Sequence, residues 1–119
     1  MKTCSSCKEC KRDDEFYRRG NSGLTNSLCK HCFNRYCMKR WVDRKLRVIE
    51  QFGGKCLDCS GQFHYAVYEF HHLDPSQKDM HWPKMRLMSE AKMQAELAKC
   101  VMLCANCHRM RHVEERLSD

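Results

Sequence analysis

The sequence predicts a small α+β protein in two cysteine-rich parts, and three observations support this fold class. The chain has 119 residues, enough for one domain or two very small ones. Eleven residues are cysteine, and most fall in Cys-x-x-Cys pairs, a density that calls for cross-links or bound metal. Two short strand-like runs, AVYEF and VML, stand among longer runs with helical spacing of apolar residues. We expect residues 1–52 and 53–119 to form separate domains.

Positive charge is concentrated in the first half of the chain. Residues 1–50 hold 13 of the 22 Lys and Arg but only 6 of the 15 Asp and Glu, so this half accounts for the formal net charge of +7. Such an imbalance favours a polyanion as partner. We therefore expect residues 1–52 to bind double-stranded DNA. The alternative is that these lysines and arginines only solubilise a helix.

The cysteines are interpreted first as metal ligands. No apolar segment near the N-terminus has the form of an export signal, and no stretch is long enough to cross a membrane. We therefore expect the protein in the cytoplasm, a reducing compartment in which disulfides are rare. The odd number of cysteines agrees, because complete disulfide pairing would leave one thiol over.

Two Cys-x-x-Cys pairs, CSSC at 4–7 and CKHC at 29–32, predict a first structural zinc site. Four thiolates from two such pairs complete a tetrahedral site with no open position for water. The turn-rich run GNSGLTNSL between them is expected at a loop tip. Disulfide pairing is the alternative, and Cys10 and Cys37 are expected to be ordinary thiols. The predicted ligands are Cys4, Cys7, Cys29 and Cys32.

After the second pair, FNRYCMKRWVDRKLRVIEQF predicts a helix that ends at Gly53-Gly54. One stripe of this helix is apolar, and a neighbouring stripe holds Arg40, Arg44 and Arg47. Because the charge on this stripe is nearly all positive, we expect the three arginines to contact DNA phosphates. A merely solvated face is the alternative.

A second structural zinc site is predicted by CLDC at 56–59 and CANC at 104–107. The segment between these pairs contains His71 and His72 directly after a strand-like run, and Cys100 is expected in the core. His108 directly follows the CANC pair and His112 lies one helical turn later, so the two histidines would share a helix face. Zinc would hold the strand beside the start of that helix. The predicted ligands are Cys56, Cys59, Cys104 and Cys107.

The run FHHLDPSQKD, followed by CVMLCANCHRMRH, resembles the HNH, or ββα-metal, endonuclease family in its zinc-containing form, over about residues 52–116. The N-terminal part, with CSSC, DEFY and CKHC, is similar to the zinc module of several phage HNH proteins and of two-zinc HNH restriction enzymes. The resemblance implies an α+β fold with a ββα-metal nuclease core, preceded by a zinc-knuckle module and a basic helix.

The resemblance also implies catalytic roles for three histidines. His71 occupies the position of the first ligand of a catalytic metal, and His108 occupies that of the second. By the same resemblance, His72 occupies the position of the general base. A division of roles between the two histidines agrees with their adjacency, because neighbouring strand residues face opposite ways and cannot easily bind one ion together. Neutral imidazole can accept a proton from water near pH 7. A divalent ion on the two ligands would neutralise charge on the phosphate and the leaving oxygen.

Three further residues have expected roles at this site. Lys99 stands where the family has an asparagine, and it could contact phosphate instead. Lys78 is expected to contact DNA. His112 is expected to contact DNA or to serve as an auxiliary ligand, with an ordinary helix surface position as the alternative.

The expected function is that of a metal-dependent DNA endonuclease or nickase with two structural Zn²⁺ ions and one catalytic divalent ion. Nitrogen ligands suit Mn²⁺, Ni²⁺, Co²⁺ or Zn²⁺ better than Mg²⁺, although family members often use Mg²⁺. Cutting both strands with one site per chain favours a homodimer, and the analogy to phage proteins suggests action in a host cytoplasm. The alternatives are a non-catalytic zinc-dependent DNA-binding protein and a nuclease that resolves branched DNA.

Overall fold

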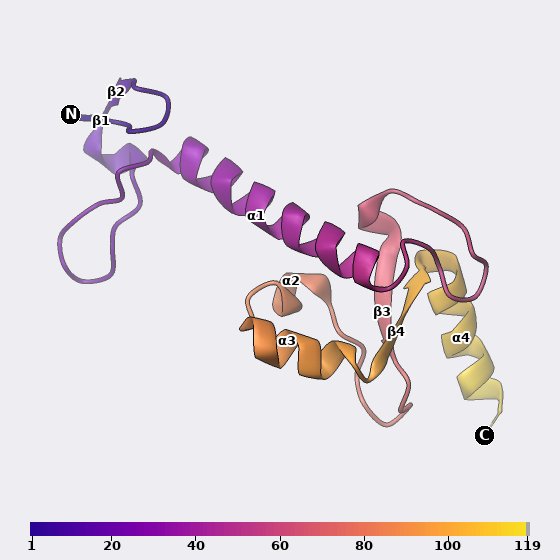
Figure 1. Cartoon of the computed structure of the whole chain (residues 1–119). Helices are drawn as coiled ribbons and strands as arrows, with labels where there is room; N and C mark the ends of the chain where they lie inside the picture. Colours follow the sequence, from indigo (N-terminus) through magenta and orange to yellow (C-terminus); the bar gives the residue numbers. More distant parts are fainter. Residues whose placement is uncertain (119) are drawn as a thin grey trace. The chain divides into compact units, whose positions relative to one another are not determined.

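The computed structural model describes residues 1–118, which form a mixed helix-and-sheet protein (Figure 1). Two compact units can be distinguished, Met1–Trp41 and a second unit that begins at Val42. The helices and strands are β1 (Lys2–Thr3), β2 (Cys10–Lys11), α1 (Lys30–Gln51), β3 (Tyr68–His72), α2 (Trp82–Met85), α3 (Glu90–Leu97), β4 (Cys100–Cys104) and α4 (Ala105–Leu117), with 3-10 turns at Asp13–Glu15 and Tyr65–Val67.

The division between the units falls inside α1 and not at its end, where the sequence placed it. The physical reason is the burial of the last turns of this helix. Lys45, Val48 and Ile49 are buried, and the two apolar residues belong to the core of the second unit. The second half of α1 is therefore part of the second unit, whereas its first turns carry a ligand of the first cysteine cluster.

The first unit has a very small core. Its two short strands pair antiparallel, with Lys2 opposite Lys11. The buried residues are Cys4, Phe16 and Cys29, so two of the three are cysteines of the first predicted metal site. A cluster of this size cannot offset the conformational entropy that folding removes from some forty residues. We therefore expect the unit to need a cross-link or a bound ion for its stability.

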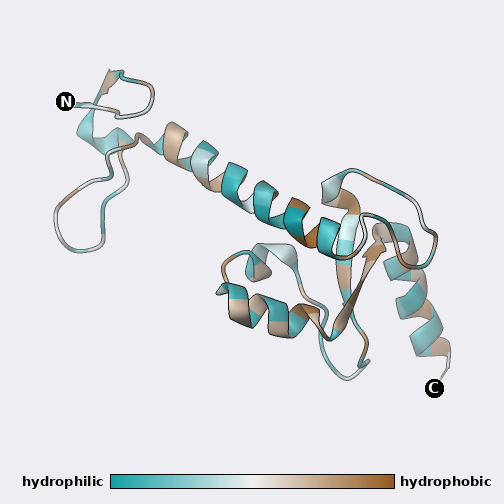
Figure 2. Ribbon diagram, viewed as in Figure 1, coloured by the Kyte–Doolittle hydropathy of each residue, from teal (hydrophilic) through white to brown (hydrophobic). Residues whose placement is uncertain are grey.

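The second unit is built on β3 and β4, which pair antiparallel with His72 opposite Cys100. Because side chains alternate along a strand, Tyr68 and Phe70 face one side, where they pack with residues of α1, α2 and α3. His71 faces the other side, toward α4. Figure 1 shows β3 and β4 side by side with α4 continuing from β4, and Figure 2 shows the apolar character of β4 against the mainly polar α4.

The junction between β4 and α4 is fixed by a thiol. Cys104 ends the strand and is the N-cap of the helix, where its Sγ accepts a hydrogen bond from the backbone N–H of Cys107. An acceptor at this position satisfies one of the free N–H groups of the first turn. The helix consequently starts at a fixed point beside the strand. In the described part of the chain, no helix is both long and apolar enough to span a bilayer.

Candidate functional site

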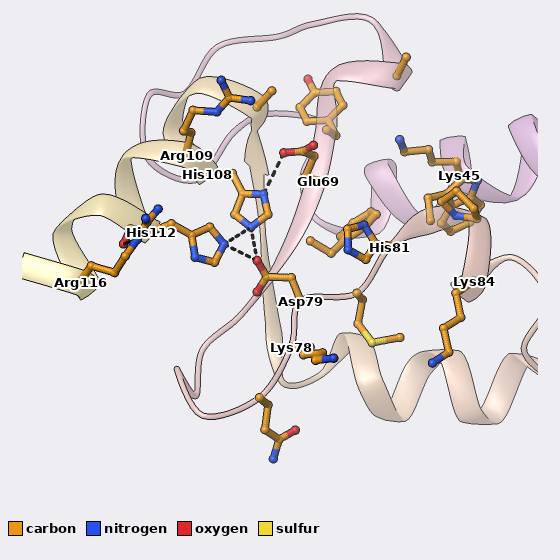
Figure 3. A pocket seen from close by; sticks show the side chains of 18 residues that line it. Lys45, Glu69, Lys78, Asp79, His81, Lys84, His108, Arg109, His112 and Arg116 are labelled. Carbon is orange, nitrogen blue, oxygen red and sulfur yellow. Dashed lines mark hydrogen bonds and ion pairs between the residues drawn. The ribbon is translucent and has the colours of Figure 1, made fainter.

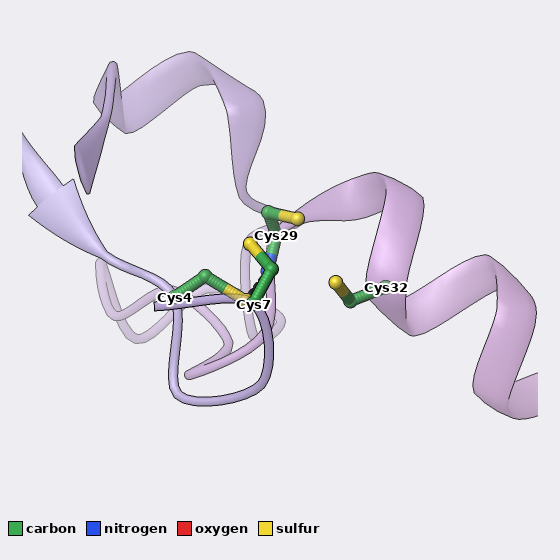
Figure 4. Close-up of side chains that lie close together, drawn as sticks. All are labelled: Cys4, Cys7, Cys29 and Cys32. Carbon is green, nitrogen blue, oxygen red and sulfur yellow. Dashed lines mark hydrogen bonds between the residues drawn. The ribbon is translucent and has the colours of Figure 1, made fainter. Parts of the chain in front are cut away.

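The first cysteine cluster gathers the four sulfurs that the sequence predicted. Cys4, Cys7, Cys29 and Cys32 point their Sγ atoms at one another within 4.8 Å (Figure 4). Cys4 Sγ accepts backbone hydrogen bonds from Cys29 at 3.3 Å and from Ser6 at 3.4 Å. The first of these is the main reason that the pKa of Cys4 is lowered to about 5. A thiolate is the form that binds metal, so the cluster could hold an ion such as zinc.

The second cysteine cluster has the same design in the other unit. Its four sulfurs also lie within 4.8 Å of one another. Burial raises the pKa of Cys56, but backbone N–H groups outweigh this and bring the pKa to about 6. All eleven cysteines are free thiols. The members are Cys56, Cys59, Cys104 and Cys107, and four thiolates again suit a closed site for a structural metal such as zinc.

A third group of ligand atoms lies between β3 and α4, and we call it the histidine–aspartate cluster. It consists of His71 on β3, Asp79 on the following loop, and His108 and His112 on α4. One ligand atom of each residue lies within 4.8 Å of the others. The structure thus brings together the two predicted metal ligands, adds His112 to them, and adds a carboxylate that the sequence did not indicate.

The positions of the His108 ring nitrogens are compatible with a cation in this cluster. His108 Nε2 and His112 Nε2 both lie close to Asp79 Oδ2, and the two nitrogens are 3.2 Å apart. Two nitrogens bound at about 2.0–2.1 Å to one tetrahedral ion would be separated by about 3.3 Å. His108 Nδ1 meets a second carboxylate, Glu69, at 2.8 Å. Both ring nitrogens of His108 thus face carboxylates, and an ion bound at Nε2 would leave Nδ1–H to donate to Glu69.

His71, like His108, has a carboxylate near each of its two ring nitrogens. Its Nδ1 faces Asp79, and its Nε2 lies 2.8 Å from Glu115 Oε1. Histidines that bind metals usually donate their second ring N–H to a carboxylate, which fixes the tautomer and the ring orientation. Glu115 and Glu69 therefore stand where carboxylates that orient ligands are expected. Both are outside the set of residues that sequence reasoning selected.

Asp79 reaches the cluster because the loop after β3 returns alongside this strand. Met80 forms an isolated β-bridge with Phe70, and the backbone N–H of His72 donates to Asp79 Oδ1 at 2.9 Å. Burial alone would raise the pKa of Asp79. The bonds from His72, His108 and His112 outweigh that effect and bring it to about 2. Asp79 is thus an anionic oxygen donor that three histidines hold in place, and it could serve as a metal ligand.

His72 lies outside the cluster. It is 3 % exposed and faces away from α4, on the side of β3 that also carries Phe70. Its Nδ1 accepts a hydrogen bond from the backbone N–H of Asp74 at 3.2 Å, and its buried Nε2 has no partner. The neutral ring therefore carries its proton on Nε2, and its free electron pair points at the Asp74 turn.

A pocket of about 870 Å³ opens beside the histidine–aspartate cluster (Figure 3). Asp79, His108 and His112 form part of its wall. His81 also lines it, is exposed, and has no side-chain hydrogen bond within the described residues. The cationic lining residues are Lys45, Lys78, Lys84, Arg109 and Arg116. An anionic ligand would therefore be attracted to the side of the cluster that faces the pocket.

The remaining predicted contacts are divided between this pocket and other surfaces. Lys78 lines the pocket. Lys99 is half exposed, pairs with Glu96 at 3.4 Å and is absent from the pocket wall. Nothing in the structure brings its ammonium group to the histidine–aspartate cluster.

The three arginines of α1 have different environments. Arg40 is exposed and lies over the ring of Tyr36 at 5.7 Å. Arg47 is also exposed. Arg44 donates to the backbone carbonyl of Arg86 at 2.8 Å and to Glu90 at 3.2 Å, so its guanidinium group already connects α1 to the α2–α3 region.

Comparison of the chain with models of protein families, with curated proteins and with solved structures finds no match.

Proposed function

We propose that the second unit is a metal-dependent phosphodiester hydrolase that acts on DNA as an endonuclease or nickase. The observation that carries this proposal is the histidine–aspartate cluster, which borders a pocket lined by five lysines and arginines. The two cysteine clusters offer four sulfurs each and suit structural zinc, whereas imidazole and carboxylate ligands beside a pocket suit an ion that keeps exchangeable positions. The resemblance to the HNH family supports the same activity.

The ligand set favours a borderline divalent ion. Three imidazoles and one carboxylate suit Mn²⁺, Co²⁺, Ni²⁺ or Zn²⁺ better than Mg²⁺, which prefers oxygen ligands. Such an ion would act as a Lewis acid on the scissile phosphate. Glu69 and Glu115 hold His108 and His71 in the orientation that this requires.

The proton of the attacking water needs an acceptor, and we assign this role to His72. Its backbone N–H holds Asp79, so the residue is adjacent to the ligands although its ring faces the other side of β3. The assignment requires that the Asp74 turn opens and that the ring moves to the side of the ligands, because Asp74 N–H occupies Nδ1 in this conformation. His81 is the competing imidazole, since it lines the pocket with no hydrogen bond to its ring within the described residues.

The experiment is a DNA-cleavage assay with zinc-loaded full-length protein. Supercoiled, nicked, linear and branched DNA would each be incubated with Mg²⁺, Mn²⁺, Co²⁺, Ni²⁺ or added Zn²⁺. We expect cleavage with at least one of the transition metals, and its loss in His108→Ala. The surface variant Lys92→Met serves as control. Absence of cleavage on every DNA with every metal would rule out the nuclease.

A second candidate is a zinc-dependent DNA-binding protein without catalytic activity. The position of His72 favours this candidate, because the imidazole that would accept the proton of the attacking water is buried and hydrogen-bonded. This candidate predicts metal-dependent DNA binding that leaves the DNA intact in the same assay. Preferential cleavage of the branched DNA would instead identify a junction-resolving nuclease.

A further inference from the structure

Lys45 is the only lysine or arginine that is buried in the part of the chain that the structure describes, with 7 % of its surface exposed. It lies on the portion of α1 that belongs to the second unit, and it lines the pocket beside the histidine–aspartate cluster. Figure 3 shows its side chain extending from α1 toward the side of the pocket where Glu69 lies. A lysine whose stem is buried while its ammonium group still reaches the solvent of a pocket can pair there with an anionic partner.

No such partner is present among the described residues. The Nζ atom of Lys45 has no hydrogen bond or ion pair with any of them. Burial lowers the pKa of Lys45 from its ordinary value of 10.5, and the charge of Glu69 opposes this only through space. The positive charge of Lys45 is therefore not neutralised by a direct contact within the described part of the chain.

Neither of the two carboxylates of the pocket wall forms an ion pair with Lys45, and both are hydrogen-bonded to histidines. Asp79 is bound by His108 and His112, and Glu69 is bound by His108 Nδ1. The other charged residues of the wall are cations, including Lys84 and Arg109. An anion from outside the chain would therefore meet, at this part of the wall, an ammonium group that has no direct partner among the described residues.

We propose that the part of the pocket at Lys45 is a binding subsite for a phosphate group of a nucleic-acid backbone, separate from the phosphate that would lie at the histidine–aspartate cluster. The compact ammonium group of lysine suits a phosphate oxygen as a point charge, and it gains most where water is excluded. The proposal rests on the proposed function for its choice of phosphate source, because inorganic phosphate offers the same oxyanion. It requires DNA binding and does not require cleavage.

The test uses zinc-loaded full-length protein without other divalent ions, and it measures the affinity for a fluorescent DNA duplex over a series of salt concentrations. Lys45→Met removes the charge and keeps the length of the side chain. Lys92→Met is the matched control, because Lys92 is exposed on α3 and lies outside the pocket wall. In Lys45→Met we expect weaker binding and a slope of log affinity against log salt that is shallower by about 0.9, the value for one phosphate contact.

The melting temperature of the same variants separates this role from a structural one. We expect Lys45→Met to melt at the same temperature as the wild type or higher, since an apolar side chain needs no partner there. Lys45→Arg should retain the wild-type salt slope. An unchanged slope in Lys45→Met, or an equal loss in Lys92→Met, would overturn the subsite.

A second measurement follows the titration of Lys45 by carbon NMR in the wild-type protein, so it does not depend on a variant that folds. We expect the pKa of Lys45 to rise when the duplex binds, because a phosphate stabilises the ammonium form. A rise with inorganic phosphate but none with the duplex would assign the subsite to free phosphate and contradict the proposal. DNA binding through Lys45 without any cleavage would remove the proposed nuclease and leave the subsite in place. Cleavage that is unaffected in Lys45→Met, with an unchanged salt slope, would remove the subsite alone.

Discussion

At the scale of single residues, the structure separates two neighbouring histidines into different environments. His71 lies between two carboxylates and faces α4, whereas His72 lies on the opposite side of β3. If His72 is the general base, His72→Ala should lower the cleavage rate by about 10²–10⁴-fold and leave metal affinity nearly unchanged. Cleavage rate and calorimetric metal binding measured on the same protein would check this.

The control for that experiment is His81→Ala. His81 lines the pocket and has no role as a ligand or orienting group. A large loss of rate in His81→Ala, together with full activity in His72→Ala, would transfer the proton-accepting role to His81. A loss of metal affinity in His72→Ala would instead show that the ring, or the backbone bond to Asp79, supports the cluster.

The carboxylates behind the ligands give a second prediction at this scale. Glu115→Ala removes the partner of His71 Nε2, so we expect the affinity for the catalytic ion to fall by about 10–100-fold. Glu114→Ala is the matched control at the preceding position of α4. Manganese binding followed by electron paramagnetic resonance would measure both variants. Equal affinities in the two would mean that Glu115 does not orient the ligand.

At the scale of secondary-structure elements, local sequence patterns were sufficient to predict the two cysteine clusters and most of the helices. The spacing within each Cys-x-x-Cys pair fixes two sulfurs on one turn, so both four-cysteine groups could be predicted from short motifs. The helix expected up to Gly53 is α1, and Cys100 lies in the core as expected. The short α2 was missed, since WPKM is too brief to show a period.

Asp79 shows why the rest of the site could not be predicted from sequence. It is a ligand candidate only because the loop after β3 returns and forms the bridge between Met80 and Phe70. No period or spacing in the sequence indicates that return. Lys45 is a similar case, because its burial follows from the packing of the second half of α1 within the second unit and not from its place in a basic helix.

The arginines of α1 lead to a prediction for this element. Arg44→Ala breaks the contacts with the Arg86 carbonyl and Glu90, so it should lower the melting temperature. Arg47→Ala removes an exposed charge, and it should keep the melting temperature but make the salt dependence of DNA binding shallower. Thermal melts and binding at several salt concentrations distinguish the two. If Arg47→Ala binds DNA with the wild-type slope, this face of α1 is solvated surface.

At the scale of the whole molecule, both units are expected to depend on metal for folding. The first unit buries little besides Phe16 and two cysteines. In the second unit, the two Cys-x-x-Cys pairs that begin at Cys56 and Cys104 come together in one cluster. We predict two tightly bound zinc ions per chain, and loss of structure when a chelator removes them. Elemental analysis and circular dichroism would test this. Disulfides in place of zinc, with the fold retained, would contradict it.

The central claim is that the histidine–aspartate cluster binds one further divalent ion and that this ion is required for DNA cleavage. The most direct measurement is a manganese titration of the two-zinc protein, in which bound manganese and cleavage rate are determined in the same samples. We predict that the rate rises in proportion to one bound manganese per chain, and that His108→Ala requires more manganese for the same rate. No binding beyond the two zinc ions, or cleavage that does not depend on the added ion, would contradict the account.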